Sequence, residues 1–230
     1  MPIRDQFLIS CYINTYLFDS ENNSITLISH DRKKRVFDVL VAGFAIITLF
    51  IPIIALAIII RLQMGSPVLF TQERAGKHGD PFVLYKFRSM TNETDENGEL
   101  LPDEERITKL GGFLRQTTLD ELPELINVLK GDMSLVGPRP LRVSYNELYS
   151  EYQSQRLDVK PGLTSWAVVK GRNALSWNRR FEYDVWYVHN RSIILDIKIL
   201  FMTVALVLRR DGVSHESHAT MPRFTGNEDD

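Results

Sequence analysis

The feature that most constrains this chain is one continuous apolar stretch, residues 39–60. It contains no charged residue, and Thr48 carries its only hydroxyl group. A helix of about 20 apolar residues is long enough to cross the hydrocarbon core of a bilayer. A polar region with candidate catalytic residues follows it. The sequence therefore predicts a protein that works at a membrane surface on a substrate dissolved in that membrane.

A proline inside this stretch leaves two topologies open. Pro52 has no backbone N–H, and its ring clashes with the carbonyl one turn back, so we expect a helix to kink or break there. Each half would then have at most about 13 residues, too few to span alone. One interpretation is a kinked helix that crosses the membrane once, since membrane helices tolerate proline. The other is a re-entrant hairpin that enters and leaves by the same face.

Basic residues flank the stretch on both sides. They precede it at 32–35 and follow it at Arg61, Arg74, Lys77, Lys86 and Arg88. The positive-inside rule would place both ends in the cytoplasm, as a hairpin requires, although the spacing alone leaves both topologies open. A secretory signal peptide does not fit, because the stretch begins far from Met1 and no A-x-A-like cleavage site follows it.

Composition narrows the function classes. The chain has 27 Lys and Arg against 29 Asp and Glu, a formal net charge of −2, which argues against a general nucleic-acid binder. Its single cysteine, Cys11, excludes a disulfide framework within the chain and fits a reducing compartment. His215 and His218 lie three apart in a polar tail, where we expect solvated side chains and no metal site.

The remaining pattern predicts an α+β fold that is mainly helical, with a small β-hairpin. Residues 67–90 contain apolar runs bounded by Gly and Asp, which is typical of two short strands around a turn. Helical patterns follow at 106–116 and 123–130, the second ending at Gly131 as a C-cap. Residues 24–29 alternate like a short strand.

Two further segments carry apolar side chains. Residues 141–156 place aromatic and leucine side chains three or four apart, which predicts a helix whose stripe packs in the core or lies at the headgroup level. Residues 193–208 are nearly all apolar but interrupted by Asp196 and Lys198, so we expect them at the interface or in the core. The predicted parts are an N-terminal extension 1–31, a membrane helix 32–62, a catalytic domain 63–213 and a polar tail 214–230.

Asp120 and Glu121 are the first candidates for chemistry. Thr118 and Glu121 have the spacing of a capping box, so a structural role at a helix start is one interpretation. Pro123 disfavours it, because a proline fits best as the first residue of a helix. The two acids would then lie on irregular backbone just outside the helix N-terminus, where both can stay ionised. One could bind Mg²⁺ while the other attacks phosphorus.

Basic side chains among small and rigid residues accompany this pair. Any one of them alone is typical of a protein surface. Pro138 and Pro140 stiffen the backbone around Arg139, which would orient its guanidinium for bidentate contact with a phosphate. The candidates for binding an anionic substrate are Lys86, Arg88, Arg115, Arg139 and Arg172.

Taken in order along the chain, these motifs resemble the bacterial sugar transferases, the small monotopic phosphoglycosyl transferases. The resemblance is collinear from about Arg32 to Val213, and its motifs are specific. They are Lys34-Arg35…Asp38, the apolar segment with Pro52, Gly65-x-Pro67-Val68, Gln72-x-Arg74-x-Gly76, Lys86-Phe87-Arg88-Ser89-Met90, Leu119-Asp120-Glu121-Leu122-Pro123, Gly131-Asp132-Met133-Ser134-Leu135-Val136-Gly137-Pro138-Arg139-Pro140, Lys160-Pro161-Gly162-Leu163-Thr164 and Gly171-Arg172-Asn173.

The resemblance implies a reaction and a location. Members of this family transfer a sugar-1-phosphate from a UDP-sugar to polyprenyl phosphate, usually undecaprenyl phosphate, and release UMP. This step begins a polysaccharide or glycoconjugate on a lipid carrier at the cytoplasmic face of the bacterial inner membrane. A re-entrant helix broken at a proline anchors the family, which favours the hairpin topology, with its break at Ile51 and Pro52.

The resemblance also implies roles for particular residues. It makes Asp120 the nucleophile that forms a covalent phosphosugar intermediate, and it associates the Asp120 and Glu121 pair, chiefly Glu121, with Mg²⁺. The implied partners are a UDP-sugar, undecaprenyl phosphate and the lipid bilayer, without nucleic acid, and a homodimer is left open. The residues implied to surround the phosphates and the nucleotide are Lys86, Arg88, Arg115, Pro138, Arg139, Pro140 and Arg172.

The chain departs from the family pattern at two places. Many members carry serine where this chain has Ile51, and that hydroxyl could satisfy backbone carbonyls freed by the break. The usual Gly-Trp-Ala-Gln is here Ser165-Trp166-Ala167-Val168, which loses one amide. The tail at 218–222 resembles the subgroup that acts on N-acetylated amino sugars.

Two other functions compete with the transferase. The first is a catalytically inactive membrane scaffold for glycan assembly, and the intact Asp120, Glu121 and Arg139 count against it. The second is a phospholipid-headgroup transferase that uses a cytidine nucleotide. That class needs several separated aspartates on helices and more membrane spans, and the sequence shows neither pattern.

Overall fold

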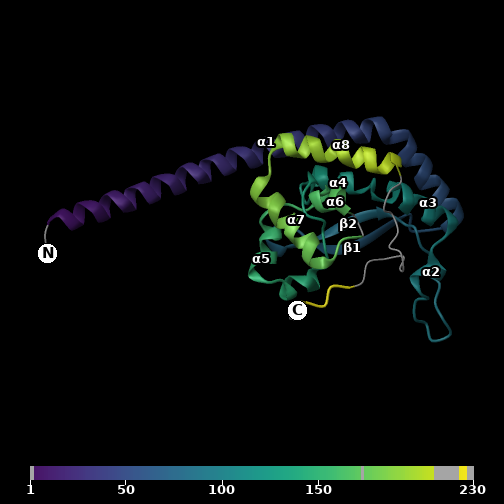
Figure 1. The fold of residues 1–230 in the computed structure, drawn as a ribbon. Coiled ribbons are helices and arrows are strands. Elements are labelled where there is room, and N and C mark those ends of the chain that lie inside the picture. The colour runs from purple at the N-terminus through teal and green to yellow at the C-terminus, as the bar shows by residue number, and fades with distance from the viewer. Residues whose placement is uncertain (1–2, 172–173, 210–222, 227–230) are drawn as a thin grey trace. The chain divides into compact units, whose positions relative to one another are not determined.

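The computed structural model describes the backbone of residues 3–171, 174–209 and 223–226, and their side chains from Asp31 onward (Figure 1). The chain separates into two compact units, Met1–Phe37 and Asp38–Asp230. Arg172 and the tail segment 218–222 lie outside the described residues. The second unit contains all of the described candidate site residues.

A single helix, α1 (Ile3–Met64), contains the N-terminal extension as well as the apolar stretch. Residues 24–29 are helical, so the strand predicted there is wrong. An alternating segment becomes a strand only when a neighbouring strand pairs with its backbone groups, whereas a helix satisfies those groups within the segment. By length and composition, Asp31–Met64 is long and apolar enough to cross a membrane, and only 6% of its most apolar window is buried.

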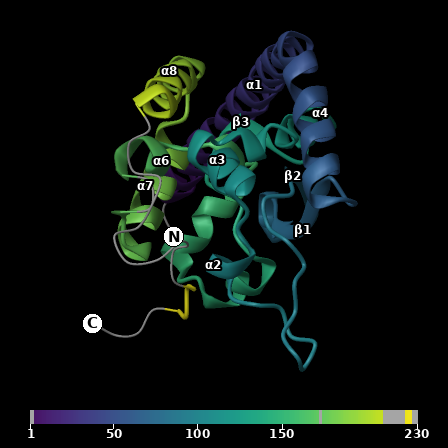
Figure 2. The same ribbon diagram turned by 90° about the vertical axis from the view of Figure 1, so that its right-hand side faces the viewer.

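The apolar part of α1 stays helical across Pro52 and changes direction. Figures 1 and 2 show its blue segment running along one side of the second unit and then turning to follow another side. A proline inside a helix removes one backbone hydrogen bond and crowds the preceding turn, and Pro52 is the proline inside this helix. We attribute the bend to it. The helix is therefore kinked without being interrupted.

Two sets of contacts fix this helix to the rest of the second unit. Near its start in this unit, the Asp38 carboxylate accepts a hydrogen bond from the backbone N–H of Leu135 at 3.2 Å. Near its end, Ile60 is fully buried in an apolar cluster with Phe87 and Leu114. The helix between these anchors leaves large apolar side chains exposed, including Phe44, Ile47, Ile51, Ile54 and Ile58.

A β-hairpin follows the helix, as predicted. Strand β1 (Leu69–Ala75) pairs antiparallel with β2 (Pro81–Phe87), and a 3₁₀ turn, η1 (Lys77–Gly79), connects them. The register places Leu69 opposite Phe87 at one end of the hairpin. The prediction of two short strands within residues 67–90 is confirmed.

Short helices then lead to the candidate site. They are α2 (Asp103–Arg106), α3 (Lys109–Thr117), the 3₁₀ turn η2 (Leu119–Glu121) and α4 (Glu124–Lys130). Gly131 ends α4 with φ of 93°, a left-handed conformation that suits glycine, so the predicted C-cap is confirmed. Gly111 is needed for close packing, because a Cβ there would lie 1.8 Å from the carbonyl oxygen of Ser89.

A second, parallel strand pair was not predicted. Strand β3 (Ser134–Val136) pairs with β4 (Gly162–Thr164). Strands of three residues are too short to show the alternation that identifies a strand in a sequence. Gly162 makes the pair possible, since a Cβ there would lie 2.0 Å from the backbone nitrogen of Gly137.

The helix predicted over residues 141–156 is wrong. The segment forms three short turns, η3 (Val143–Leu148), α5 (Glu151–Ser154) and η4 (Gln155–Asp158). Tyr149 is extended, and the Ser150 hydroxyl caps α5 in a capping box, so the local hydrogen bonds start a new helix there. Most of the stripe is core, since Tyr145 is buried with Phe181 and Phe224, whereas Tyr152 is 49% exposed.

Three further helices complete the second unit: α6 (Trp166–Gly171), α7 (Trp177–Asn190) and α8 (Ile193–Arg209). Helix α8 buries Asp196 and Ile199, and the Tyr187 hydroxyl on α7 lies 2.6 Å from the Asp196 carboxylate. Its other face exposes Ile194, Phe201, Val204 and Leu208. In both views, α8 lies on the side of this unit that the apolar part of α1 also occupies (Figures 1 and 2).

Candidate active site

The Asp120 and Glu121 pair lies on the single turn η2, between α3 and α4. Thr118 ends α3 in the left-handed conformation, at φ of 60°, and its side chain makes no capping hydrogen bond to η2. The capping-box interpretation is therefore not observed. Leu119 and Leu122 on either side of the pair pack into the apolar cluster around Ile60. This packing anchors the turn against the end of the apolar helix.

Two cations hold the Glu121 carboxylate. Its Oε1 atom accepts hydrogen bonds from Lys86 Nζ at 2.6 Å and from Arg139 Nη2 at 2.7 Å. Burial alone would raise the pKa of Glu121, but the charges of Arg139 and Lys86 outweigh burial and lower this pKa to about 2. Lys86 comes from β2 and Arg139 from the loop after β3. Three residues predicted from the sequence therefore meet at one oxygen atom.

Glu124 is a third buried carboxylate, which the sequence prediction missed. Its Oε1 lies 3.2 Å from Lys86 Nζ, and the residue is 3% exposed. Burial raises the pKa of Glu124 to about 7, with the charge of Lys86 opposing that rise. Its position at the start of α4, three residues after Glu121, was the available signal.

Asp120 differs from both of its acidic neighbours. It is 9% exposed, and among the described residues no hydrogen bond or ion pair to its carboxylate is found. Burial, and next the charge of Glu121, raise the pKa of Asp120 to about 6. An unpaired carboxylate with a raised pKa is a better nucleophile than one that is held in an ion pair. The structure thus gives the two adjacent acids different environments.

A buried ion pair supports the loop that carries Arg139. The guanidinium of Arg156 donates a hydrogen bond to the backbone carbonyl of Arg139 at 2.6 Å. The same guanidinium contacts Asp184 Oδ2 at 3.1 Å from Nε and 3.0 Å from Nη2. Both residues of this pair are 2% exposed or less. Sequence reasoning missed them, because 28 residues separate them and neither lies in a motif with an assigned role.

The other predicted basic residues take different positions. Arg88 donates to the backbone carbonyls of Met64, Pro67 and Met90, so it secures the C-terminal end of α1. Arg115 donates to the Ser89 hydroxyl at 3.2 Å. Its charge acts to lower the pKa of Asp120, although less than burial raises it. Arg172 lies outside the described residues, and Pro138 and Pro140 flank Arg139.

Comparison with known proteins assigns this sequence to a family. Residues 29–210 match the bacterial sugar transferase family, which is most of the chain. The chain belongs to the bacterial sugar transferases. This confirms the resemblance drawn from the motifs.

Named relatives of this sugar transferase include short and long proteins. It is 54% identical over 196 residues to EpsL of Bacillus subtilis, an uncharacterized sugar transferase, covering 85% of this chain and 97% of that protein. It is 41% identical to the undecaprenyl-phosphate galactose phosphotransferase of Salmonella typhimurium, covering 78% of this chain and 41% of that protein. It is 40% identical to the UDP-glucose:undecaprenyl-phosphate glucose-1-phosphate transferase of Klebsiella pneumoniae, covering 82% of this chain and 42% of that protein.

The acidic residues of this sugar transferase fit a magnesium ion that also binds substrate. Within the described part of the chain, no group of three or more acidic, His or Cys side chains is arranged to hold a metal alone. Mg²⁺ is usually bound by one or two carboxylates together with substrate phosphates. Asp120 carries an unpaired carboxylate, and Glu121 uses only its Oε1 atom in the contacts with Lys86 and Arg139. These two oxygen donors match that mode of binding.

Proposed function

We propose that this sugar transferase moves a sugar-1-phosphate from a UDP-sugar to undecaprenyl phosphate and releases UMP. The relatives named for this chemistry support the substrates. The observation that carries the proposal is the contrast on η2: Glu121 is held by two cations, while Asp120 beside it is buried and unpaired. The reaction would be the first membrane step in building a bacterial polysaccharide or glycoconjugate.

Two displacements at phosphorus account for the reaction. A carboxylate oxygen of Asp120 attacks the phosphorus that bears the sugar, the bond from that phosphorus to the UMP oxygen breaks, and UMP leaves with the electron pair. A phosphate oxygen of undecaprenyl phosphate then attacks the same phosphorus. The bond to Asp120 breaks, which regenerates the carboxylate and yields the diphosphate-linked lipid sugar. Neither step requires net transfer of a proton.

The charged groups around η2 are suited to this chemistry. Both substrates are anions that repel each other, and Lys86 and Arg139 supply fixed positive charge next to the nucleophile. Holding Glu121 in two ion pairs fixes its orientation relative to Asp120. When bound by Asp120 and Glu121, Mg²⁺ would offset charge on the diphosphate.

We further propose that the apolar part of α1 is a re-entrant hairpin and that the catalytic site faces the cytoplasm. Three features support this topology: the bend, the exposed apolar side chains of α1, and the exposed apolar face of α8 on the same side of the second unit. Leu119 and Leu122 pack against the end of the helix, so the turn with Asp120 lies close to the membrane. A lipid-linked phosphate could then reach the nucleophile without leaving the bilayer.

The test of the reaction is UMP release from a panel of UDP-sugars in the presence of undecaprenyl phosphate and Mg²⁺. The panel includes glucose, galactose and N-acetylated amino sugars, because the predicted preference for the last group rests on residues outside the described part. Asp120→Asn should abolish UMP release while thermal unfolding stays close to wild type, since an amide cannot form the acyl phosphate.

Two outcomes would contradict this function. Wild-type turnover by the Asp120→Asn protein would remove Asp120 from the mechanism. Absence of UMP release from every member of the panel, with the protein folded and in a bilayer, would favour the inactive scaffold. The matched control is Asp132→Asn, a partly exposed acid at the end of α4 that is not in the proposed chemistry.

A further inference from the structure

A second set of arginines extends the charged site along one face of the β-hairpin. Lys86 on β2 lies opposite Phe70 on β1, and Arg74 lies four residues further along β1. Cross-strand partners share a face of the sheet, and so do residues two apart on one strand, so Arg74 projects from the same face as Lys86. Four residues of a strand span about 13 Å. The face therefore carries cations well beyond the Asp120 turn.

Arg142 joins this set from the loop that carries Arg139. The backbone N–H of Ala75 donates to the carbonyl of Leu141 at 2.9 Å. This bond places Arg74 and Arg142, the immediate neighbours of the bonded residues, on adjacent segments. Arg139 lies three residues before Arg142 in the same loop. Two backbone segments thus bring three guanidinium groups together.

Among the described residues, Arg74 and Arg142 have no carboxylate of their own in an ion pair, and the charge of Glu124 acts on Arg74 less than the charges of Arg139 and Arg142 do. Glu121 is committed to Lys86 and Arg139, and Glu124 to Lys86. The contact of Arg74 is with a neutral amide oxygen, Gln72 Oε1, at 2.6 Å, and its buried Nε has no hydrogen-bond partner. Within the described residues, no ion pair to the Arg142 side chain is found.

The pKa of Arg74 reports the same imbalance. Burial, followed by the positive charges of Arg139 and Arg142, lowers this pKa to about 10. Arg74 is partly buried, and a cation removed from water next to like charges is unfavourable unless an anion binds among them. The cluster is therefore built to receive an anion.

We propose that Arg74 and Arg142 bind the phosphate of the leaving nucleoside monophosphate. This group departs when Asp120 forms its covalent bond to the sugar phosphate. This inference rests on the proposed function, since it assigns the UMP phosphate of the UDP-sugar to the part of the site that contains Arg74 and Arg142. The sugar is a neutral group that requires no cation. The phosphate of UMP gains negative charge as its bond breaks, so cations there stabilise the transition state.

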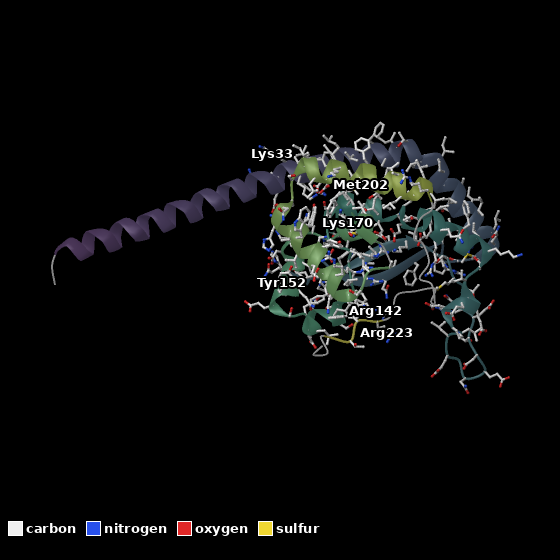
Figure 3. The ribbon with its side chains drawn as sticks, in the orientation of Figure 1. Lys33, Arg142, Tyr152, Lys170, Met202 and Arg223 are labelled. Atoms are coloured by element: carbon white, nitrogen blue, oxygen red, sulfur yellow. The ribbon has the colours of Figure 1, made fainter. Side chains whose placement is uncertain are left out.

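The position of the arginines distinguishes this phosphate from that of the lipid. Figure 3 shows Arg142 well separated from Met202 on α8, the helix that exposes an apolar face. The lipid phosphate would arrive from that apolar side and meet the turn with Asp120 first. A water-soluble nucleotide can enter from the other side. Arg74 and Arg142 lie on the nucleotide's path.

The experiment measures binding of UMP to the full-length protein in detergent micelles or nanodiscs, together with steady-state turnover. The variants are Arg142→Gln and Arg74→Gln, and the matched control is Arg179→Gln, an exposed arginine of α7 paired with Glu182. We expect each site variant to weaken UMP binding and to lower kcat/KM for the UDP-sugar by about tenfold or more, the scale of one lost charge-assisted hydrogen bond. The KM for undecaprenyl phosphate and the control should stay close to wild type.

The outcomes separate this inference from the proposed function. If the wild-type protein neither binds UMP nor releases it from any UDP-sugar of the panel, the proposed function fails. If the wild type binds UMP and a folded Arg142→Gln variant binds it equally well, this inference alone is overturned. A loss that falls on undecaprenyl phosphate would overturn it too, by assigning the arginines to the lipid phosphate. Thermal unfolding identifies the variants that fold. If Arg74→Gln does not fold, the result for Arg142→Gln decides, because Arg142 is partly exposed and its replacement disturbs the core less.

Discussion

Removing the Asp184 carboxylate should destabilise the protein strongly. Asp184 and Arg156 are 1% and 2% exposed. The Nε and Nη2 atoms of Arg156 both donate to Oδ2 of Asp184. In Asp184→Ala the Arg156 cation would stay buried without its partner, and breaking a buried pair in this way costs about 3–5 kcal/mol. For a chain of this size 1 kcal/mol shifts Tm by about 2–4 °C, so Tm should fall by about 6–20 °C.

A surface ion pair on the same helix is the matched control. Arg179 and Glu182 on α7 form an ion pair in which both side chains are about half exposed. Exposed pairs contribute about 0–1 kcal/mol, so Glu182→Ala should lower Tm by no more than about 4 °C. The measurement is thermal unfolding of each variant in the same detergent, without substrate.

The double variant Asp184→Ala/Arg156→Met adds a second check. It removes both charges, and replacement of a buried pair by apolar side chains is often neutral or stabilising, so much of the lost stability should return. Equal Tm values for Asp184→Ala and Glu182→Ala would refute the reasoning, because they would show that the pair contributes no more than a surface contact.

Four further results are expected. Arg139→Lys should reduce UMP release by about tenfold or more, nearly as much as Arg139→Ala, because lysine keeps the charge but loses the planar guanidinium. Full activity of Arg139→Lys would show that only the positive charge at this position matters. The kcat/KM for the UDP-sugar should rise with pH through about 6, where Asp120 loses its proton, and a profile flat across this range would argue against this nucleophile. Cysteines placed at residues 30 and 66 in a cysteine-free background should both be labelled from the cytoplasm, and labelling of residue 30 from the opposite side would establish a single-pass helix. Pro52→Ala should straighten the helix and shift labelling toward that single-pass pattern.

Several elements could be predicted because their signals are local. The apolar run, the Gly and Asp residues that bound the hairpin, and Gly131 at the end of α4 each act within a few residues of chain. Pro123 likewise placed Asp120 and Glu121 ahead of α4, and the structure has them on a separate turn. These features follow from backbone conformation, which a sequence of a few residues largely determines.

Other parts could not be predicted because they depend on distant partners. Lys86 and Glu121 are 35 residues apart, and no spacing rule indicates that they meet. The segment at 141–156 has helical spacing, but Tyr145 and Tyr149 pack in a cluster with Phe181 and Phe224 that forms only in the folded chain. Glu124 reads as an ordinary first-turn acid until Lys86 is placed beside it.

The buried end of α1 has a consequence for any attempt to obtain a soluble fragment. Ile60 packs with Phe87 and Leu114, and the same cluster includes Leu119 and Leu122, which flank the Asp120 and Glu121 pair on η2. The last turns of the helix are thus part of the core of the second unit as well as the end of the proposed membrane segment. Cutting the chain before β1 would open the cluster to water and loosen the turn that holds Asp120. The apolar helix and the candidate site are therefore best purified and studied as one piece, in lipid or detergent.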